Sequence, residues 1–248
     1  MSFSFYVLFV SLFSVIAYSF AKKAYQKKEI VKQFAQVKCK PITPENTIIT
    51  FDLHDVIVNY DYSEISKTFF KSKKKLKLLI AMLNPFVWYD IIKLKWHDSV
   101  AEQYIVGLGE KYASLKPYIP LGIRIANCQR PNHQVIKLLK ELKSKGYTLH
   151  LFSNIGAQIF EQFKIKFPEI IKHFDLTSIP SKQNGYLKKP YHKAFAHYLE
   201  KLKHDDRQII FIDDKAQNIQ KAASYGIIGV HFSNLYQLKK DLATIGLK

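Results

Sequence analysis

Short runs of apolar, largely β-branched residues recur along the chain after position 46, and amphipathic patterns lie between them. The runs occupy positions 47–53, 147–152, 208–212 and 227–232. Apolar residues predominate in each run, which is typical of a strand buried on both faces. Between the runs, apolar residues return at helical spacing in 133–146, where Gly146 stands at the expected helix end, and in 193–203. Strands that alternate with helices predict an α/β domain with a doubly wound parallel sheet.

The first 20 residues carry no charged side chain and are mostly Phe, Val, Leu, Ile and Tyr. About 20 apolar residues are enough for a helix to cross the hydrocarbon core of a bilayer. Lysines follow closely at positions 22, 23, 27, 28 and 32. Because basic flanks stay on the cytoplasmic side, we predict a transmembrane anchor at 1–21, a basic juxtamembrane linker at 22–46, and a cytoplasmic domain after it.

A cleaved secretory signal is the alternative interpretation of this segment. Ser19, Phe20 and Ala21 match a small-x-small cleavage site, and cleavage there would make the protein a secreted one. The segment lacks a basic stretch ahead of its apolar run, however, and the run exceeds the usual length of a signal peptide core. We therefore prefer the retained anchor, with the membrane contacted through residues 1–20.

A long, mostly helical pattern separates the first predicted strand from the second. It includes the sequence KSKKKLKLLIAMLNPFVWYDIIKLKW, which the pair Asn84-Pro85 divides into pieces too short to span a bilayer. Lysines beside aromatic side chains suit a segment on a membrane surface with anionic lipid headgroups. The alternative is that the apolar side chains pack on the sheet domain and the lysines are simply solvated. The aromatic residues concerned are Phe86, Trp88, Tyr89 and Trp96.

The charge balance narrows the choice of partners. The chain has 38 Lys and Arg against 20 Asp and Glu, a formal net charge of +18. Such an excess favours nucleic acid, anionic lipid or phosphorylated substrates, although a Lys-rich source proteome would produce it as well. No nucleic-acid-binding motif accompanies the charge. The two cysteines, Cys39 and Cys128, show no metal-binding spacing and fit a reducing compartment.

Polar residues end three of the predicted strands. Asp52 ends the first, Ser153 and Asn154 the second, and Asp213 with Asp214 the third. Ligands of doubly wound sheets bind beyond the carboxyl ends of the strands, so these side chains should converge. An isolated Asp at such a place is often only a helix cap, but the set as a whole is hard to explain by packing. Clustered carboxylates suit Mg²⁺, which prefers oxygen ligands and commonly binds substrate phosphate as well.

Four segments, in this order, resemble the motifs of the haloacid dehalogenase-like hydrolase superfamily. They are FDLHDVIV, HLFSN, GYLKKPYHKAF and IIFIDDKAQNIQKAASYGIIGVHF, and the resemblance runs from position 48 to about 232. The last segment is the most specific, because Asn218, two alanines and Gly226 follow the Asp pair at fitting intervals. The resemblance implies a Rossmann-like core at 47–58 and 130–248, with a helical cap inserted at 59–129 that selects the substrate.

The resemblance also assigns roles to the polar residues at the strand ends. Asp52 would be the nucleophile, giving an aspartyl-phosphate, and a Mg²⁺ ligand together with Asp213 and Asp214. Ser153 and Asn154 would bind the substrate phosphate. Lys189 would neutralise charge on the phosphate and on the nucleophile.

The first motif departs from the pattern of the phosphatases at two positions. Their second Asp, the general acid and base, is replaced by His54, and the Gly after it by Asp55. An imidazole with an ordinary pKa of about 6.5 suits proton transfer near neutrality. The resemblance implies that the metal takes the backbone carbonyl of His54, so that metal binding survives. If the turn needs a positive φ at position 55, the backbone of Asp55 is strained there, because a residue with a side chain enters that region less easily than Gly.

Two functions of different classes follow from these observations. The first is a membrane-anchored, Mg²⁺-dependent phosphatase acting on a phosphorylated small molecule, lipid or protein. The second is a catalytically weak relative that uses the same pocket to bind a phosphorylated partner or an anionic membrane component. His54 is the residue that separates them. A dehalogenase ranks third, since it has no use for the acidic metal site.

Overall fold

The computed structural model describes residues 41–81, 84–93, 101–202 and 205–247. The predicted anchor at 1–21 and all but the last six residues of the predicted linker lie outside them. Among the helices of these described ranges, none combines the length and the apolar character that a membrane span requires.

Five parallel strands form the central sheet, in the spatial order β5-β4-β1-β6-β7. The four predicted strands are confirmed, with ends within two residues of the prediction. The fifth, β5, lies at one edge and was not predicted, because its short pattern does not stand out from a loop. The strands are β1 (Thr47–Phe51), β4 (Thr148–Phe152), β5 (Leu176–Ser178), β6 (Gln208–Asp213) and β7 (Ile228–His231).

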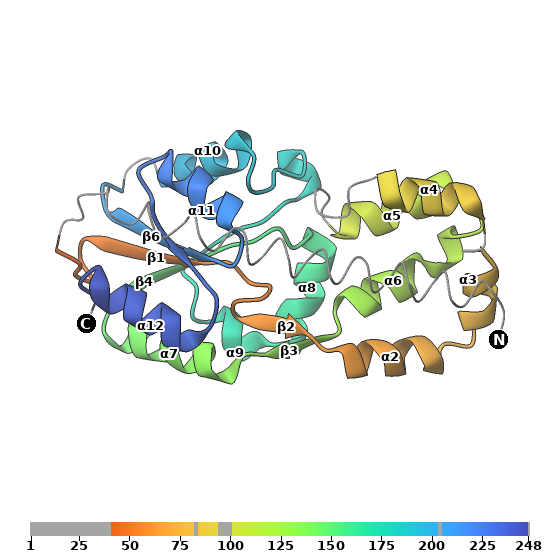
Figure 1. The fold of residues 1–248 in the computed structure, drawn as a ribbon, viewed down its shortest axis with the longest axis horizontal. Coiled ribbons are helices and arrows are strands. Elements are labelled where there is room, and N and C mark those ends of the chain that lie inside the picture. Colours follow the sequence, from red (N-terminus) through yellow and green to blue (C-terminus); the bar gives the residue numbers. More distant parts are fainter. Residues whose placement is uncertain (1–40, 82–83, 94–100, 203–204, 248) are drawn as a thin grey trace.

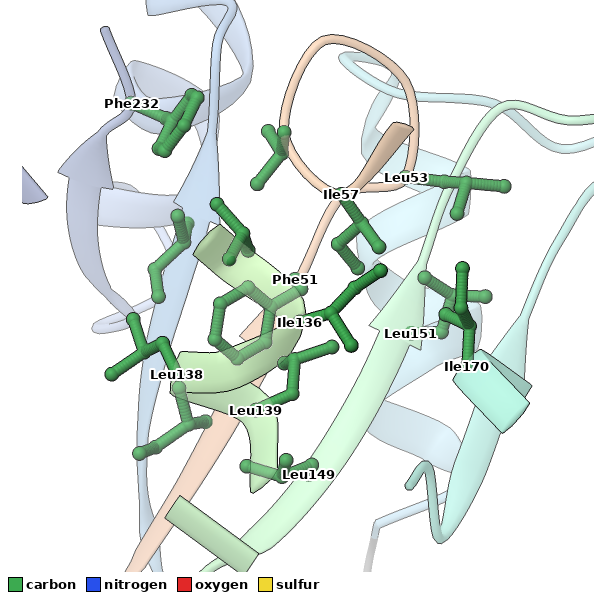
Figure 2. Close-up of a cluster of buried hydrophobic side chains, with 14 of the residues drawn as sticks. Phe51, Leu53, Ile57, Ile136, Leu138, Leu139, Leu149, Leu151, Ile170 and Phe232 are labelled. Carbon is green, nitrogen blue, oxygen red and sulfur yellow. The ribbon is translucent and has the colours of Figure 1, made fainter. Parts of the chain in front are cut away.

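Helices cover both faces of the sheet because successive strand residues point to opposite sides. Ile49 and Phe51 of β1 face one side, where they join the cluster formed with α7 and α12. Ile48 faces the other side, towards α10 and α11. Figure 2 shows Leu138 and Leu139 of α7 packed around Phe51. The helices are α7 (His133–Ser144), α8 (Ala157–Lys166), α9 (Pro168–Ile171), α10 (His192–Glu200), α11 (Ala216–Ala223) and α12 (Leu235–Thr244).

The two helices predicted from periodicity are confirmed, and both end earlier than predicted. At the start of α7, the side chain of Asn132 accepts a hydrogen bond from the backbone N–H of Val135 at 3.4 Å. After α7, Gly146 has a φ of 88°, a conformation that favours glycine and closes the helix as predicted. A short 3-10 turn, η3 (Lys182–Asn184), precedes α10.

One polar group of side chains interrupts the apolar packing beneath α10. The hydroxyl of Tyr198 lies 2.6 Å from the Thr50 hydroxyl and 3.0 Å from Nδ1 of His150. Burial lowers the pKa of His150 to about 4. The neutral imidazole therefore belongs to the folded core, and protonation of it opposes folding.

The insertion leaves and re-enters the core through a small sheet of its own. β2 (Val58–Tyr60) pairs antiparallel with β3 (Gln129–Pro131), so the predicted cap boundaries at 59 and 129 fall within paired strands. Figure 1 shows the helices between them on the side of the sheet towards which β1 runs. These are α2 (Tyr62–Lys71), α3 (Lys75–Ala81), α4 (Pro85–Lys93), α5 (Ala101–Lys111), η2 (Lys116–Tyr118) and α6 (Ile119–Ala126).

Several apolar side chains of the cap do not pack on the sheet domain. Leu76 and Ile80 of α3 are exposed, and so are Phe86 and Tyr89 of α4. For these residues the alternative of burial against the core is wrong. Trp96 lies outside the described residues.

Candidate active site

Three carboxylates from two strand ends form one cluster. Asp52 directly follows β1, and Asp213 ends the neighbouring strand β6, with Asp214 next to it. One carboxylate oxygen of each lies within 4.8 Å of the others. Asp52 and Asp213 are buried, and Asp214 is half-buried. The predicted convergence is therefore confirmed, and it follows from β1 and β6 being parallel neighbours.

Lys189 supplies the positive charge at the centre of this cluster. Its Nζ lies 2.6 Å from Asp213 Oδ2 and 3.0 Å from Asp52 Oδ1. It also donates to the carbonyl of Phe152 at 2.6 Å, and the rings of Phe152 and Phe211 flank it. The ammonium is buried together with its partners, so this ion pair acts in a medium that screens charge poorly.

The loop after β4 places Ser153 and Asn154 beside Lys189. Ser153 is buried, and its Oγ accepts a long hydrogen bond of 3.4 Å from the N–H of Ile155. The side chain of Asn154 donates to the backbone carbonyl of Lys189 and accepts from its N–H, both at 2.8 Å. Asn154 therefore fastens the lysine loop, a positioning role that the sequence did not indicate. Its predicted contact with substrate stays a prediction.

Asp213 is oriented by the start of α11. The backbone N–H of Lys215 donates to Asp213 Oδ1 at 2.8 Å. The side-chain amide of Asn218 lies 2.9 Å and 2.8 Å from the two carboxylate oxygens. Asn218 was part of the fourth motif, and its contact explains that spacing: one helical turn brings the amide back over the strand end.

The donor set fits a hard divalent cation. Oδ1 of Asp214 is buried and accepts no hydrogen bond from the described residues. Burial, together with the charges of Asp213 and Asp52, raises the pKa of Asp214 to about 8. For Asp52, burial raises the pKa, but Lys189 and Lys215 outweigh it and leave the value below normal. The ionised form of Asp52 is thus favoured, whereas ionisation of Asp214 beside it is opposed by its neighbours' negative charges. A cation with oxygen ligands would relieve this repulsion.

His54 is held by a residue at the edge of the cap. The side-chain nitrogen of Gln129 lies 2.9 Å from Nε2 of His54 and donates to the carbonyl of Ala126 at 3.0 Å. A carbonyl only accepts, so this end of Gln129 is its NH₂ group, and Nε2 of His54 is the acceptor. Burial is the main cause that lowers the pKa of His54. The ring also stacks on Tyr60, with centroids 5.2 Å apart.

The turn after His54 has the strained geometry that the sequence suggested. Asp55 adopts a φ of 62°, a region that glycine enters more easily than other residues. Its N–H donates to the carbonyl of Val58 at 2.7 Å, and this bond closes the turn into β2.

Sequence reasoning missed two residues of the site. One is Lys215, which follows the Asp pair in the sequence. Burial lowers its pKa, but the charges of the three carboxylates of the cluster outweigh burial and leave the pKa above normal. Its adjacency to a recognised motif was a usable signal. Gln129 gave no such signal, because its contact with His54 joins residues 75 positions apart.

A parallel sheet with carboxylates at its strand ends and a helical insertion after the first strand defines a Rossmann-like α/β fold with an inserted cap. A model of the haloacid dehalogenase-like hydrolase family matches residues 124–231. The matched residues include the second and third motifs and nearly all of the fourth, so the similarity to this family lies in the second half of the chain.

Two curated proteins are similar in sequence. A sesquiterpene phosphatase of Aspergillus oryzae is 30% identical over 109 residues, which are 43% of this chain and 53% of that protein. The chain thus spans about half the length of this relative. Flavin mononucleotide hydrolase 1 of Arabidopsis thaliana is 26% identical over 208 residues, 81% of this chain and 78% of that protein.

Solved structures share the fold. A haloacid dehalogenase family enzyme of Bacteroides thetaiotaomicron, in complex with magnesium and inorganic phosphate, has a TM-score of 0.53 at 19% identity. That match covers 78% of this chain and 98% of the other. An L-2-haloacid dehalogenase of Xanthobacter autotrophicus has a TM-score of 0.50 at 12% identity and covers 82% of this chain and 83% of the other.

Proposed function

We propose that the chain is a Mg²⁺-dependent phosphatase that hydrolyses a phosphate monoester through Asp52. The observation that carries the proposal is the cluster of Asp52, Asp213 and Asp214, whose ligand atoms lie within 4.8 Å of one another. One similar curated protein is named a sesquiterpene phosphatase and the other a flavin mononucleotide hydrolase, and a structural relative holds magnesium and inorganic phosphate. A phosphorylated small molecule is therefore the substrate class that we favour over a lipid or protein.

In this proposal Asp52, Asp213 and Asp214 hold the cation, with the backbone carbonyl of His54 as a further ligand. The bound cation supplies charge compensation for the phosphoryl oxygens. A carboxylate oxygen of Asp52 forms a bond to phosphorus while the ester oxygen leaves. Lys189 offsets the charge that collects on the phosphoryl group, and Ser153 donates a hydrogen bond to it.

His54 completes the reaction as the general acid and base. It gives a proton to the leaving alkoxide and later takes one from the water that attacks the aspartyl-phosphate. Gln129 donates to Nε2, so the ring is neutral in the arrangement described. The neutral form is the one needed for the second step. The first step requires His54 to gain a proton, so the hydrogen bond from Gln129 to Nε2 must break first.

The same geometry favours the second candidate function, a catalytically weak protein that binds a phosphorylated partner. Burial lowers the pKa of His54, and Gln129 occupies the nitrogen that would take up a proton. Both facts oppose the role of His54 as an acid. Under this alternative Lys189 and Ser153 still bind phosphate, and turnover is lost.

Hydrolysis of 4-nitrophenyl phosphate separates the two functions. The full chain, with Mg²⁺ and with a chelator, is compared with Asp52→Asn and with His54→Asp. A phosphatase is active only with Mg²⁺ and loses all activity in Asp52→Asn. The weak-binder alternative holds if the wild type binds inorganic phosphate without turnover and His54→Asp gains activity. A wild type that neither binds inorganic phosphate nor hydrolyses the ester would refute both.

We further propose that residues 1–20 anchor the protein in a membrane and leave the α/β domain in the cytoplasm. The apolar run followed by lysines supports this orientation. The exposed apolar residues of α3 and α4 stand beside lysines, which suits contact with anionic lipid headgroups. The full chain should stay in the membrane pellet after a carbonate wash, whereas a chain beginning at Pro41 should be released. A mature protein that begins near Lys22 would instead show a cleaved signal.

A further inference from the structure

A buried carboxylate of the cap ends at the start of a core helix. Glu102, in the first turn of α5, is 3% exposed. Its Oε2 accepts hydrogen bonds from the backbone N–H groups of Gln158 at 2.7 Å and Ile159 at 3.2 Å. These groups belong to the first turn of α8, where the helix itself provides no partner for them. Glu102 thus caps α8 from another part of the fold.

The residue at the N-cap position of α8 leaves room for this carboxylate. Gly156 makes no side-chain cap, and a Cβ built on it would lie 2.5 Å from Cβ and Oε2 of Glu102. Its φ of −70° and ψ of 153° are open to any residue, so the backbone does not demand glycine. The close approach of Glu102 is the reason for a glycine here.

The capped turn continues directly from the phosphate-binding loop. Ser153 and Asn154 precede Gly156 by three and two positions, and Asn154 fastens the backbone of Lys189 through two hydrogen bonds. Fixing the start of α8 therefore fixes one end of the segment that positions Ser153 and Lys189. Figure 1 shows α8 at the junction of the sheet domain and the cap.

The ion pair between the cap and the far end of α8 is exposed and carries less of the attachment. Lys166, at the far end of the helix, pairs with Glu64 of α2 at 2.9 Å, and both side chains are more than a third exposed. Exposed pairs of this kind contribute little, because water competes for both charges. Glu102 differs in being desolvated and in touching the end of α8 next to the site.

We infer that Glu102 is a positioning residue that couples seating of the cap to placement of the phosphate-binding loop. With the cap seated, Glu102 orders the start of α8, and Ser153 and Lys189 are held for the phosphate. When the cap lifts, the two N–H groups turn to water and the loop relaxes. Phosphate binding and cap closure therefore support each other. The inference rests on the proposed function in one respect, that this loop receives phosphate.

The test uses the full chain and a cycle of variants. Glu102→Ala removes the carboxylate, and Gly156→Ala displaces it without changing it. Each should lower kcat/KM about 5- to 30-fold, the effect of losing one helix cap. In the Glu102→Ala background, Gly156→Ala should cost less than it does in the wild type, because the carboxylate is gone and only the Cβ of residue 102 remains to be displaced. Glu102→Gln keeps an acceptor oxygen and should recover most of the loss. Glu64→Ala is the matched control, and its effect should be small.

A second readout does not depend on turnover. Inorganic phosphate should slow hydrogen exchange at the amides of Gln158 and Ile159 in the wild type, but not in Glu102→Ala. A purely structural cap would change the exchange rate without making it respond to phosphate. Equal protection in both proteins, or additive effects of Glu102→Ala and Gly156→Ala on the melting temperature, would overturn the inference. An inactive wild type that shows the phosphate-dependent protection would refute only the phosphatase proposal.

Discussion

Replacing Lys189 by Met tests whether its ammonium holds the carboxylate cluster together. The change keeps an unbranched stem and removes a charge that lies 2.6 Å from Asp213 and 3.0 Å from Asp52. All three side chains are buried. Removal of one partner from a buried ion pair typically lowers the free energy of unfolding by about 3–5 kcal/mol, because the remaining charge is left uncompensated. We expect a loss in this range when a chelator is present.

Two further conditions show whether the loss has this cause. In an Asp213→Asn background one carboxylate is already neutral, so Lys189→Met should cost less, with a coupling free energy of about 0.5–3 kcal/mol. Mg²⁺ should restore part of the lost charge and stabilise Lys189→Met more than the wild type. One bound ion at a hundred times its dissociation constant adds about 2.7 kcal/mol.

Urea unfolding, followed by circular dichroism and by fluorescence, measures these differences. Lys143→Met is the matched control, since Lys143 pairs with Asp175 at 2.8 Å on the surface, where such a pair is worth about 1 kcal/mol or less. If Lys189→Met costs no more than Lys143→Met, or costs the same with and without Asp213→Asn, the electrostatic account of the cluster is wrong.

Three other predictions follow from the site and the core. Millimolar Mg²⁺ should raise the melting temperature of the wild type and leave that of Asp213→Asn unchanged; a gain in both would place the ion elsewhere. His54→Ala should lower turnover by about 10²–10⁴-fold and keep the Mg²⁺-dependent stabilisation, with the larger loss for esters whose leaving group needs a proton. The folded state lowers the pKa of His150 from 6.5 to about 4, so protons bind the unfolded chain more readily and stability falls as the pH drops from 6.5 towards 4. The loss is about 3 kcal/mol at most, and urea titrations of His150→Gln should show a flatter dependence on pH in this window.

The sheet and the acidic cluster could be predicted from the sequence because both depend on local patterns. Buried strands show as apolar runs, and the carboxyl ends of parallel strands share one edge of a sheet. The neighbouring positions of β1 and β6 then bring Asp52 and Asp213 together with no further information. The motif order supported the same conclusion through the resemblance.

The residues that hold the site in place could not be predicted, because their contacts join distant parts of the chain. Glu102 reaches residues 56 and 57 positions away, and Gln129 reaches His54 across 75. A lone Glu or Gln in a helical pattern looks like any solvated residue. Asn154 was recognised as part of a motif, but its side chain bonds the backbone of Lys189 and so holds that loop in place. A motif identifies a residue without saying which of its atoms are already engaged.

The pairing of β2 with β3 has a consequence for how such a protein can change. The polypeptide leaves the core and returns to it side by side, with Tyr60 opposite Gln129 in the register. An inserted segment whose two ends meet in this way can be exchanged without altering the strand order of its host. Recognition of a different ligand can then arise by replacement of the segment between Asp61 and Cys128, while the carboxylate cluster is inherited intact. One constraint remains: any replacement segment must again bring an acceptor to the open start of α8.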